Sequence, residues 1–283
     1  MDNTPRRSFR HIQVRRIAGA LGAEIEGVDA AQPLAAEVIA EVRQAFLDHL
    51  VVFIRNQKLT PRAQLAFAQR FGQPMEYPQL KGLPECPLVT PVVKLENERV
   101  NFGGVWHSDT SYLARPPMAS MLYAVETPPR GGDTLFANQY LAYQTLSEGL
   151  QQTLAGLVGV NSSAKADVSK TREDRLRDAG AELKVLIGEH PVVRTHPETG
   201  RKALYLNFGH TARFRGWTEP ESAPLLDYLF MHQVKPEFTC RFQWEPGSLA
   251  FWDNRCAQHY PVNDYHGFRR VMHRVTLEGD SPS

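Results

Sequence analysis

The chain has few cysteines and no excess of charge of either sign. Its 283 residues include three cysteines, Cys86, Cys240 and Cys256, which are too few and too scattered for a disulfide framework or a thiolate zinc site. Lysine and arginine number 32, aspartate and glutamate 31, and the formal net charge of +1 gives no strong field to attract nucleic acid or an anionic membrane. We therefore expect a protein of the reducing cytoplasm whose partners are small molecules.

Long apolar runs and phosphate-binding motifs are also missing. The sequence has no run of about 18 apolar residues, and its first residues, MDNTPRRSFRHIQVRR, lack the apolar segment of a signal peptide, so neither membrane spanning nor secretion is expected. Neither GxGxxG after a strand nor a P-loop pattern occurs, which argues against a nucleotide phosphate cradle. Because repeats, low-complexity tracts and linkers are absent too, we expect one domain over residues 1–283, with 42% apolar residues to build its core.

Helical patterns occur in the first half of the chain. In residues 33–50 apolar side chains recur at helical spacing, and the apolar run VVFI follows at once as a short strand. Thr60 followed by Pro61 is typical of a helix start, and we expect this helix to run to Phe71. The two other expected helices cover residues 141–157 and 220–233.

The last third of the chain has the period of β-strands. Apolar and polar residues alternate in FTCRFQW, residues 238–244, and a turn at Pro246 and Gly247 would return the chain as SLAFWD, the second strand of a hairpin. With VMHRVTL and ALYLNF, this favours a β-rich α+β fold, closer to a sandwich or jelly roll than to a parallel sheet. The charged, weakly periodic residues 162–189 fit either a surface helix or a lid inserted over a site.

The run WHSDTSY, residues 106–112, places a histidine and an aspartate two apart in a strand-like stretch. On an extended strand His107 and Asp109 would point to the same face, as two metal ligands do. A histidine simply hydrogen-bonded to a nearby carboxylate is the ordinary interpretation of such a pair. A second histidine would complete the facial triad of non-haem Fe(II) oxygenases, which leaves positions open for other ligands. The residues alone do not select that ligand from the other nine histidines.

Three motifs together carry a family resemblance. WHSDTSY, then GGDTLF at residues 131–136, then WDNRCAQHYPVNDYHGFRRVMHR at residues 252–274 resemble the taurine dioxygenase family of Fe(II)/2-oxoglutarate-dependent oxygenases, and FAQRFG and HPVVRTHPETGRKALYLN fit the same order. The resemblance implies a double-stranded β-helix, a distorted jelly roll flanked by helices. It also implies Fe(II), with 2-oxoglutarate and dioxygen as cosubstrates. The residues that it implies are His107, Asp109 and His259 as iron ligands, and Thr134 and Arg270 at the distal carboxylate of 2-oxoglutarate.

The arginines near the C-terminus fit these implied roles. A planar guanidinium holds a carboxylate by two parallel hydrogen bonds, which suits Arg270 better than a lysine. Its neighbour Arg269 is expected to face away. Arg274 lies four residues further along the same strand face, and the resemblance implies that it binds the anionic group of the substrate.

The rest of the substrate pocket departs from the taurine-specific members. Tyr77 stands where they have a sulfonate-contacting histidine, Gly103 where they have an asparagine, and His210 where they have a phenylalanine. These exchanges favour a bulkier or less polar substrate than taurine, although Tyr77 and His210 could also merely pack near the site. For Trp106 and Trp252 we expect core packing rather than contact with substrate.

The resemblance implies a dioxygenase that hydroxylates the carbon next to the anionic group of a small organic acid and releases succinate and CO2. Candidate substrates are sulfonates such as taurine, alkyl sulfates and aryloxyalkanoates. The presence of Asp109 argues against a halogenase. The alternatives are a zinc hydrolase, which leaves Arg270 and Thr134 without a role, and a non-catalytic metal-binding or regulatory protein on the same fold. Enzymes of this kind are often homo-oligomers.

Overall fold

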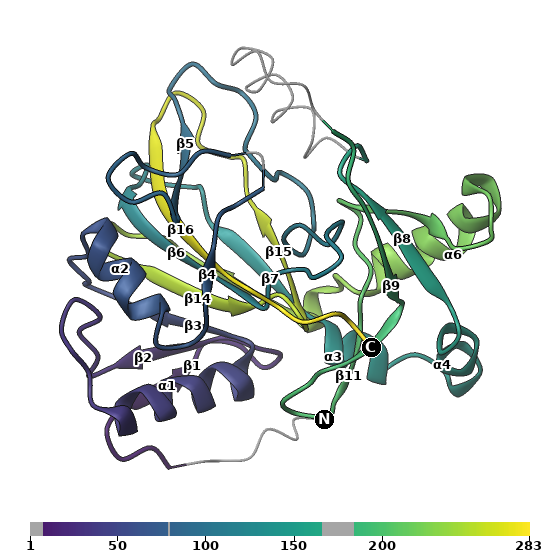
Figure 1. Ribbon diagram of the computed structural model, residues 1–283, viewed down its shortest axis with the longest axis horizontal. Helices are drawn as coiled ribbons and strands as arrows, with labels where there is room; N and C mark the ends of the chain where they lie inside the picture. The colour runs from purple at the N-terminus through teal and green to yellow at the C-terminus, as the bar shows by residue number, and fades with distance from the viewer. Residues whose placement is uncertain (1–7, 79, 166–183) are drawn as a thin grey trace.

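The computed structural model describes residues 8–78, 80–165 and 184–283 (Figure 1). Its larger sheet has eight strands in the order β1-β2-β3-β14-β6-β16-β4, with β5 also paired to β16. These strands are β1 (Gln13–Arg16), β2 (Ala23–Glu26), β3 (Val51–Ile54), β4 (Pro74–Met75), β5 (Val89–Lys94), β6 (Ala119–Glu126), β14 (Leu249–Asp253) and β16 (Arg270–Leu277).

A second sheet, in the order β13-β7-β15, faces the larger one. Its strands are β7 (Thr134–Asn138), β13 (Thr239–Phe242) and β15 (Ala257–Pro261). The described residues form two further small sheets: β12-β8-β9, made of β8 (Val158–Ser162), β9 (Ile187–Pro191) and β12 (Thr211–Phe214), and β10-β11, made of β10 (Val193–Thr195) and β11 (Lys202–Leu204). Within the described ranges the helices are α1 (Ala36–His49), α2 (Pro61–Ala68), α3 (Gln139–Gln144), α4 (Glu148–Leu154), α6 (Glu219–His232) and the 3₁₀ turn η1 (Pro236–Phe238).

Apolar side chains fill both faces of the larger sheet. On one face α1 and α2 cover it, and Phe46 of α1 stacks on Phe251 of β14 with ring centroids 4.1 Å apart. On the other face Phe53 of β3 stacks on Phe242 of β13, 3.8 Å apart, and joins the two sheets. Burial of such a ring stabilises the fold by roughly 2–3 kcal/mol. The β-rich prediction of a jelly-roll core flanked by helices is confirmed.

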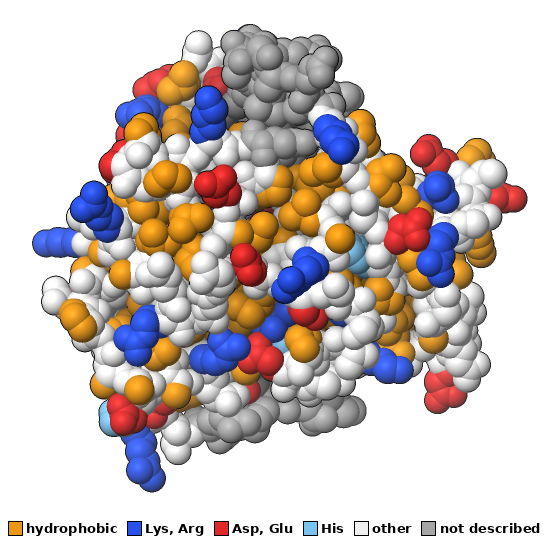
Figure 2. Space-filling model, viewed as in Figure 1, with side chains coloured by type: hydrophobic (Ala, Val, Ile, Leu, Met, Phe, Trp, Pro, Cys, Tyr) orange, Lys and Arg blue, Asp and Glu red, His pale blue; other side chains and the backbone are white. Residues whose placement is uncertain are grey.

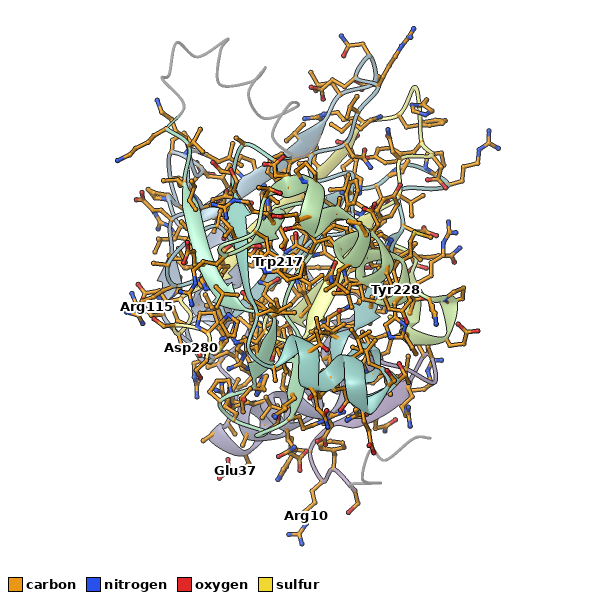
Figure 3. The ribbon with its side chains drawn as sticks, turned by 90° about the vertical axis from the view of Figure 1, so that its right-hand side faces the viewer. Arg10, Glu37, Arg115, Trp217, Tyr228 and Asp280 are labelled. Carbon is orange, nitrogen blue, oxygen red and sulfur yellow. The ribbon has the colours of Figure 1, made fainter. Side chains whose placement is uncertain are left out.

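Two of the predicted helices have different bounds in the structure. Residues 141–157 do not form one helix, because α3 ends at Gln144 and Ser147 caps a new helix, α4, by accepting a hydrogen bond from the Leu150 amide. Thr60 caps α2 as expected, but the α-helix ends at Ala68, three residues before Phe71. The helices predicted at 33–50 and 220–233 correspond to α1 and α6, and α6 exposes Tyr228 to solvent (Figure 3).

The predicted hairpin of residues 238–253 is wrong. Both strands form, but β13 pairs with β7 whereas β14 pairs with β3 and β6 in the larger sheet. The turn at Gly247, with φ at +83°, therefore carries the chain from one sheet to the other. Alternating apolar residues identified the strands correctly, but this pattern does not specify which neighbour each strand pairs with.

Part of the predicted lid, residues 166–183, lies outside the described residues. Within the described ranges no helix is long and apolar enough to cross a membrane. On the face seen in Figure 2, basic and acidic side chains are interspersed, as the nearly balanced composition leads one to expect.

Candidate active site

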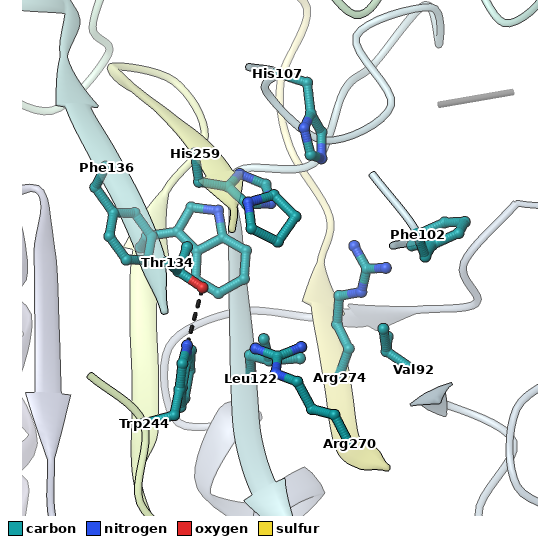
Figure 4. A pocket seen from close by; sticks show the side chains of 12 residues that line it. Val92, Phe102, His107, Leu122, Thr134, Phe136, Trp244, His259, Arg270 and Arg274 are labelled. Carbon is teal, nitrogen blue, oxygen red and sulfur yellow. Dashed lines mark hydrogen bonds between the residues drawn. The ribbon is translucent and has the colours of Figure 1, made fainter. Parts of the chain in front are cut away.

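A cavity lies between the two sheets and receives side chains from both (Figure 4). It is lined by Val92, Phe102, His107, Leu122, Thr134, Phe136, Trp244, Trp252, His259, Pro261, Arg270 and Arg274. Arg270 and Arg274 reach it from the same face of β16, and the outward-facing Arg269 instead pairs with Glu126 at the surface, as predicted. The structure thus brings five of the nine predicted site residues into one cavity.

The backbone of His107 is tied directly to that of His259. The His107 amide donates to the His259 carbonyl at 3.1 Å, and the His259 amide donates to the His107 carbonyl at 2.9 Å. Beyond this bridge the chain turns, with Thr110 in the left-handed region at φ +43°. The prediction that WHSDTSY is an extended strand is therefore wrong. A two-residue bridge followed by a turn, and not strand alternation, brings His107 and Asp109 together.

The donor set of His107, Asp109 and His259 fits a divalent metal ion. Their ligand atoms all lie within 4.8 Å of one another, and all three side chains are buried. The Nδ1 of His107 lies 2.7 Å from the Val105 carbonyl, which only accepts, so Nδ1 carries the proton and Nε2 keeps its lone pair. Burial lowers the pKa of His107, and it lowers that of His259 further. Both imidazoles are therefore neutral, as metal ligands must be.

Both carboxylate oxygens of Asp109 accept hydrogen bonds from buried side chains. Ser120 donates to Oδ2 at 2.6 Å, and the Nη1 of Arg274 donates to Oδ1 at 2.9 Å. Ser120 in turn accepts from Asn254, whose side-chain oxygen accepts from Trp252 Nε1. Burial alone would raise the pKa of Asp109, but the charge of Arg274 and the hydrogen bond from Ser120 hold it well below its ordinary value. The carboxylate is therefore ionised, and its orientation is fixed by Ser120 and Arg274.

The Ser120 hydroxyl is expected to be needed for tight metal binding. Its removal in a Ser120→Ala variant should weaken Mn(II) binding by roughly 10- to 100-fold, because groups that orient a metal ligand typically contribute that much affinity. Electron paramagnetic resonance of free Mn(II) measures this. Ser222→Ala is the matched control, since that buried hydroxyl bonds to Phe214 and Thr218 near α6. Equal Mn(II) affinity in the two variants would contradict the role given to Ser120.

Arg270 presents an open edge to the cavity. Its guanidinium is buried and hydrogen-bonded to Tyr265, yet Nε and Nη2 have no hydrogen-bond partner within the described part of the chain. These two nitrogens form the edge of a guanidinium that can donate two parallel hydrogen bonds to a carboxylate. Thr134 lines the same cavity, and its oxygen accepts from Trp244 Nε1 at 2.9 Å, so its hydroxyl proton remains available to an acceptor (Figure 4).

Arg274 lies in a more apolar part of the cavity. Its guanidinium is 4.3 Å from the centroid of the Tyr77 ring and 5.4 Å from that of Phe102. Val92 and Leu122 line the cavity as well. An anion bound to Arg274 would thus have aliphatic and aromatic side chains as its neighbours. Tyr77 does not line the cavity itself, but its ring packs against the guanidinium of Arg274, which does.

Gly103 and His210 both lie beside His107 and not in the cavity wall. Gly103 has φ +73°, and a Cβ atom there would be 2.9 Å from Cε1 of His107, so a side chain would press on the imidazole. The His210 ring is 6.1 Å from that of His107 and packs edge-on against Tyr112. These positions shape the metal region more directly than the substrate region.

The two tryptophans close to the proposed ligands, Trp106 and Trp252, have different surroundings. Trp106 packs against Tyr260 with ring centroids 5.6 Å apart, as the packing prediction had it. Trp252 is buried and packs 4.8 Å from the His259 ring, but it also lines the cavity. Its indole N–H donates a hydrogen bond to the side-chain oxygen of Asn254. The sequence did not predict this contact, although WDN was part of the motif that carried the resemblance.

A second buried cluster, His196, Asp253 and Cys256, is not suited to a metal. The Nε2 of His196 contacts Asp253 at 3.0 Å, and its Nδ1 accepts from the amides of Glu198 and Thr199, so neither nitrogen is free. Burial raises the pKa of the Cys256 thiol well above its usual value. Because Asp253 ends β14 and Cys256 precedes β15, this cluster fixes the turn that leads to His259.

Comparison with known proteins agrees with this geometry. The family model described as "Taurine catabolism dioxygenase TauD, TfdA family" matches residues 13–276. An alkylsulfatase of Acinetobacter baylyi is 35% identical over 96% of this chain and 86% of its own length. An alpha-ketoglutarate-dependent sulfate ester dioxygenase of Pseudomonas putida is 36% identical over 96% and 91%. The crystal structure of a putative alpha-ketoglutarate-dependent taurine dioxygenase from Burkholderia xenovorans is similar with a TM-score of 0.83, at 38% identity over 96% and 94% of the two chains.

Proposed function

The chain belongs to the taurine catabolism dioxygenase TauD, TfdA family, and from this membership we propose that it is an Fe(II)/2-oxoglutarate-dependent dioxygenase acting on a small organic anion. The reaction hydroxylates the carbon next to the anionic group and releases succinate and CO2. The observation that carries the proposal is the open edge of Arg270 in the cavity that also holds His107 and His259. A zinc hydrolase would have no use for a buried guanidinium edge at this point.

Each residue has a role in the proposed reaction. His107, Asp109 and His259 would hold Fe(II), Arg270 and Thr134 would hold the distal carboxylate of 2-oxoglutarate, and Arg274 would hold the substrate anion. Bound iron supplies the oxidative decarboxylation of 2-oxoglutarate by dioxygen and the oxidising power for C–H hydroxylation.

The protein's contribution to this reaction is binding, orientation and the exclusion of water. Arg270 fixes one end of the cosubstrate through two parallel hydrogen bonds, and the Thr134 proton adds a third. Arg274 would place the substrate's anionic group, and therefore the carbon beside it, close to the metal ligand Asp109, with which it already pairs at 2.9 Å. We also propose that residues 1–283 act as one catalytic domain, since both sheets contribute side chains to the same cavity.

Among the candidate substrates we propose alkyl sulfate esters. The cavity near Arg274 offers one buried cation and the side chains of Val92, Phe102 and Leu122, which suit an anionic head with an apolar tail. The alkylsulfatase and the sulfate ester dioxygenase described above each align with 96% of this chain. Hydroxylation of the carbon that bears a sulfate ester gives an unstable product, which breaks its C–O bond to release sulfate and an aldehyde. Alkyl sulfonates and aryloxyalkanoates are the alternatives, with sulfite and a phenol as leaving groups.

A substrate panel tests this proposal. Purified protein with Fe(II), ascorbate and 2-oxoglutarate should form succinate and sulfate in equal amounts from a medium-chain alkyl sulfate. Taurine, longer alkyl sulfonates and aryloxyalkanoates are run in parallel, with sulfite and phenol assayed. Turnover with taurine but not with alkyl sulfates would contradict the inference that the pocket beside Arg274 binds an apolar substrate tail. No substrate-dependent succinate with any compound would contradict the proposed activity on these anions.

A further inference from the structure

The turn at residues 261–265 contacts several of the segments that carry the site residues. It leads from β15, which carries His259, towards β16, which carries Arg270. The amide of Val262 donates to the Asp133 carbonyl, next to Thr134 on β7. The carboxylate of Asp264 accepts from the Gly132 amide at 2.7 Å, on the same approach to β7. The turn is therefore joined to the strand that carries one of the two proposed cosubstrate contacts.

The same turn is also joined to the segment before His107. The side chain of Asn263 donates to the Arg99 carbonyl at 2.7 Å. Asn101 is buried, and its side-chain nitrogen Nδ2 donates to the backbone carbonyls of Pro261 and Val262 at 3.3 and 3.0 Å. Asn101 lies six residues before His107, so these contacts join the turn to the segment that leads to that histidine.

Tyr265 stands between Asn101 and Arg270. Its hydroxyl donates to the Asn101 side-chain oxygen at 2.7 Å and accepts from the Arg270 guanidinium. The ring is 3% exposed, and Lys94 Nζ lies 4.3 Å from its centroid. Burial raises the pKa of Tyr265, so the phenol keeps the proton that it donates to Asn101. One hydroxyl thus contacts both the proposed cosubstrate anchor and the segment that leads to a proposed metal ligand.

We propose that Tyr265 is a positioning residue that orients Arg270 towards 2-oxoglutarate and locks it to the Asn101 segment. The guanidinium donates one hydrogen bond to the Tyr265 hydroxyl, and Nε and Nη2 are left for the cavity. Without it, the guanidinium could rotate about its long side chain, and the cosubstrate would have to immobilise it on binding. This inference rests on the proposed role of Arg270.

A Tyr265→Phe variant tests the inference, since it removes only the hydroxyl and keeps the ring beside Lys94. The dissociation constant of 2-oxoglutarate, measured by calorimetry with Mn(II) present, should rise roughly ten-fold or more, because hydrogen bonds to charged groups contribute that much. The KM for 2-oxoglutarate should rise in parallel, with a smaller change in kcat at saturation. Mn(II) affinity without 2-oxoglutarate should stay close to that of the wild type.

Tyr123→Phe is the matched control. That buried hydroxyl also makes two hydrogen bonds, to the Gln57 carbonyl and from the Leu59 amide, on the far side of the larger sheet from the cavity. It should lower the melting temperature without changing 2-oxoglutarate affinity. Equal 2-oxoglutarate affinity in Tyr265→Phe and wild type, or equal weakening in both variants, would overturn the inference. Failure of the wild type to bind 2-oxoglutarate would instead overturn the proposed function.

Discussion

An Asp109→Ala variant is expected to lose substrate-dependent succinate formation by roughly a thousand-fold or more, well beyond the 10- to 100-fold that removal of a supporting group costs. The variant removes the one carboxylate among the three candidate ligands, and two neutral imidazoles alone give a weak site for a hard divalent ion. Mn(II) binding, followed by electron paramagnetic resonance, should be lost together with activity. Retained turnover would contradict the assignment of Asp109 as a metal ligand.

The same variant should also be less stable, and this effect needs its own control. Arg274 is 4% exposed and pairs with Asp109, so the substitution leaves a buried guanidinium without its carboxylate, at a cost of roughly 3–5 kcal/mol. Asp280→Ala removes the carboxylate that pairs with another buried arginine, Arg194, away from the cavity. It should lower the melting temperature but leave turnover intact at temperatures where it remains folded. Loss of activity in both variants would mean that destabilisation, and not metal binding, explains the Asp109 result.

The parts of the site that follow from local sequence could be predicted. Arg270 and Arg274 share a strand face because side chains alternate along β16, and their even spacing is visible in the sequence. The helix start at Thr60 follows from its capping residue, and the Thr60 side chain accepts the expected amide hydrogen bond. Such features depend on a few neighbouring residues and on one periodicity.

The parts that depend on distant residues could not be predicted. Ser120 is 11 residues from Asp109, and Asn254 is 145 residues from it, yet together they fix its carboxylate. The bond from Tyr265 to Asn101 spans 164 residues. The predicted hairpin was wrong for the same reason. β13 and β14 do not pair with each other but with strands that are distant in the sequence, β7 and β6. Composition and periodicity hold no information on these pairings, and only the folded topology supplies them.

An Arg270→Gln variant is expected to weaken 2-oxoglutarate binding by roughly a hundred-fold or more, since truncation of a buried, hydrogen-bonded charge partner costs several kcal/mol. Glutamine keeps a donor but loses both the charge and the two-nitrogen edge. Arg270→Lys keeps the charge and loses only the edge, so its binding should lie between that of Arg270→Gln and the wild type. Calorimetry with Mn(II) present measures all three, and Mn(II) binding alone should change little.

The neighbouring arginine provides the control for this series. Arg269 carries the same charge one residue away but pairs with Glu126 at the surface, and its side chain is 44% exposed. Arg269→Gln therefore changes the net charge of the chain equally while leaving the cavity untouched, and its 2-oxoglutarate affinity should equal that of the wild type. If Arg269→Gln weakened binding as much as Arg270→Gln, a general field of positive charge would explain the affinity. If only Arg270→Gln weakens it, the effect requires the guanidinium edge at that point in the cavity.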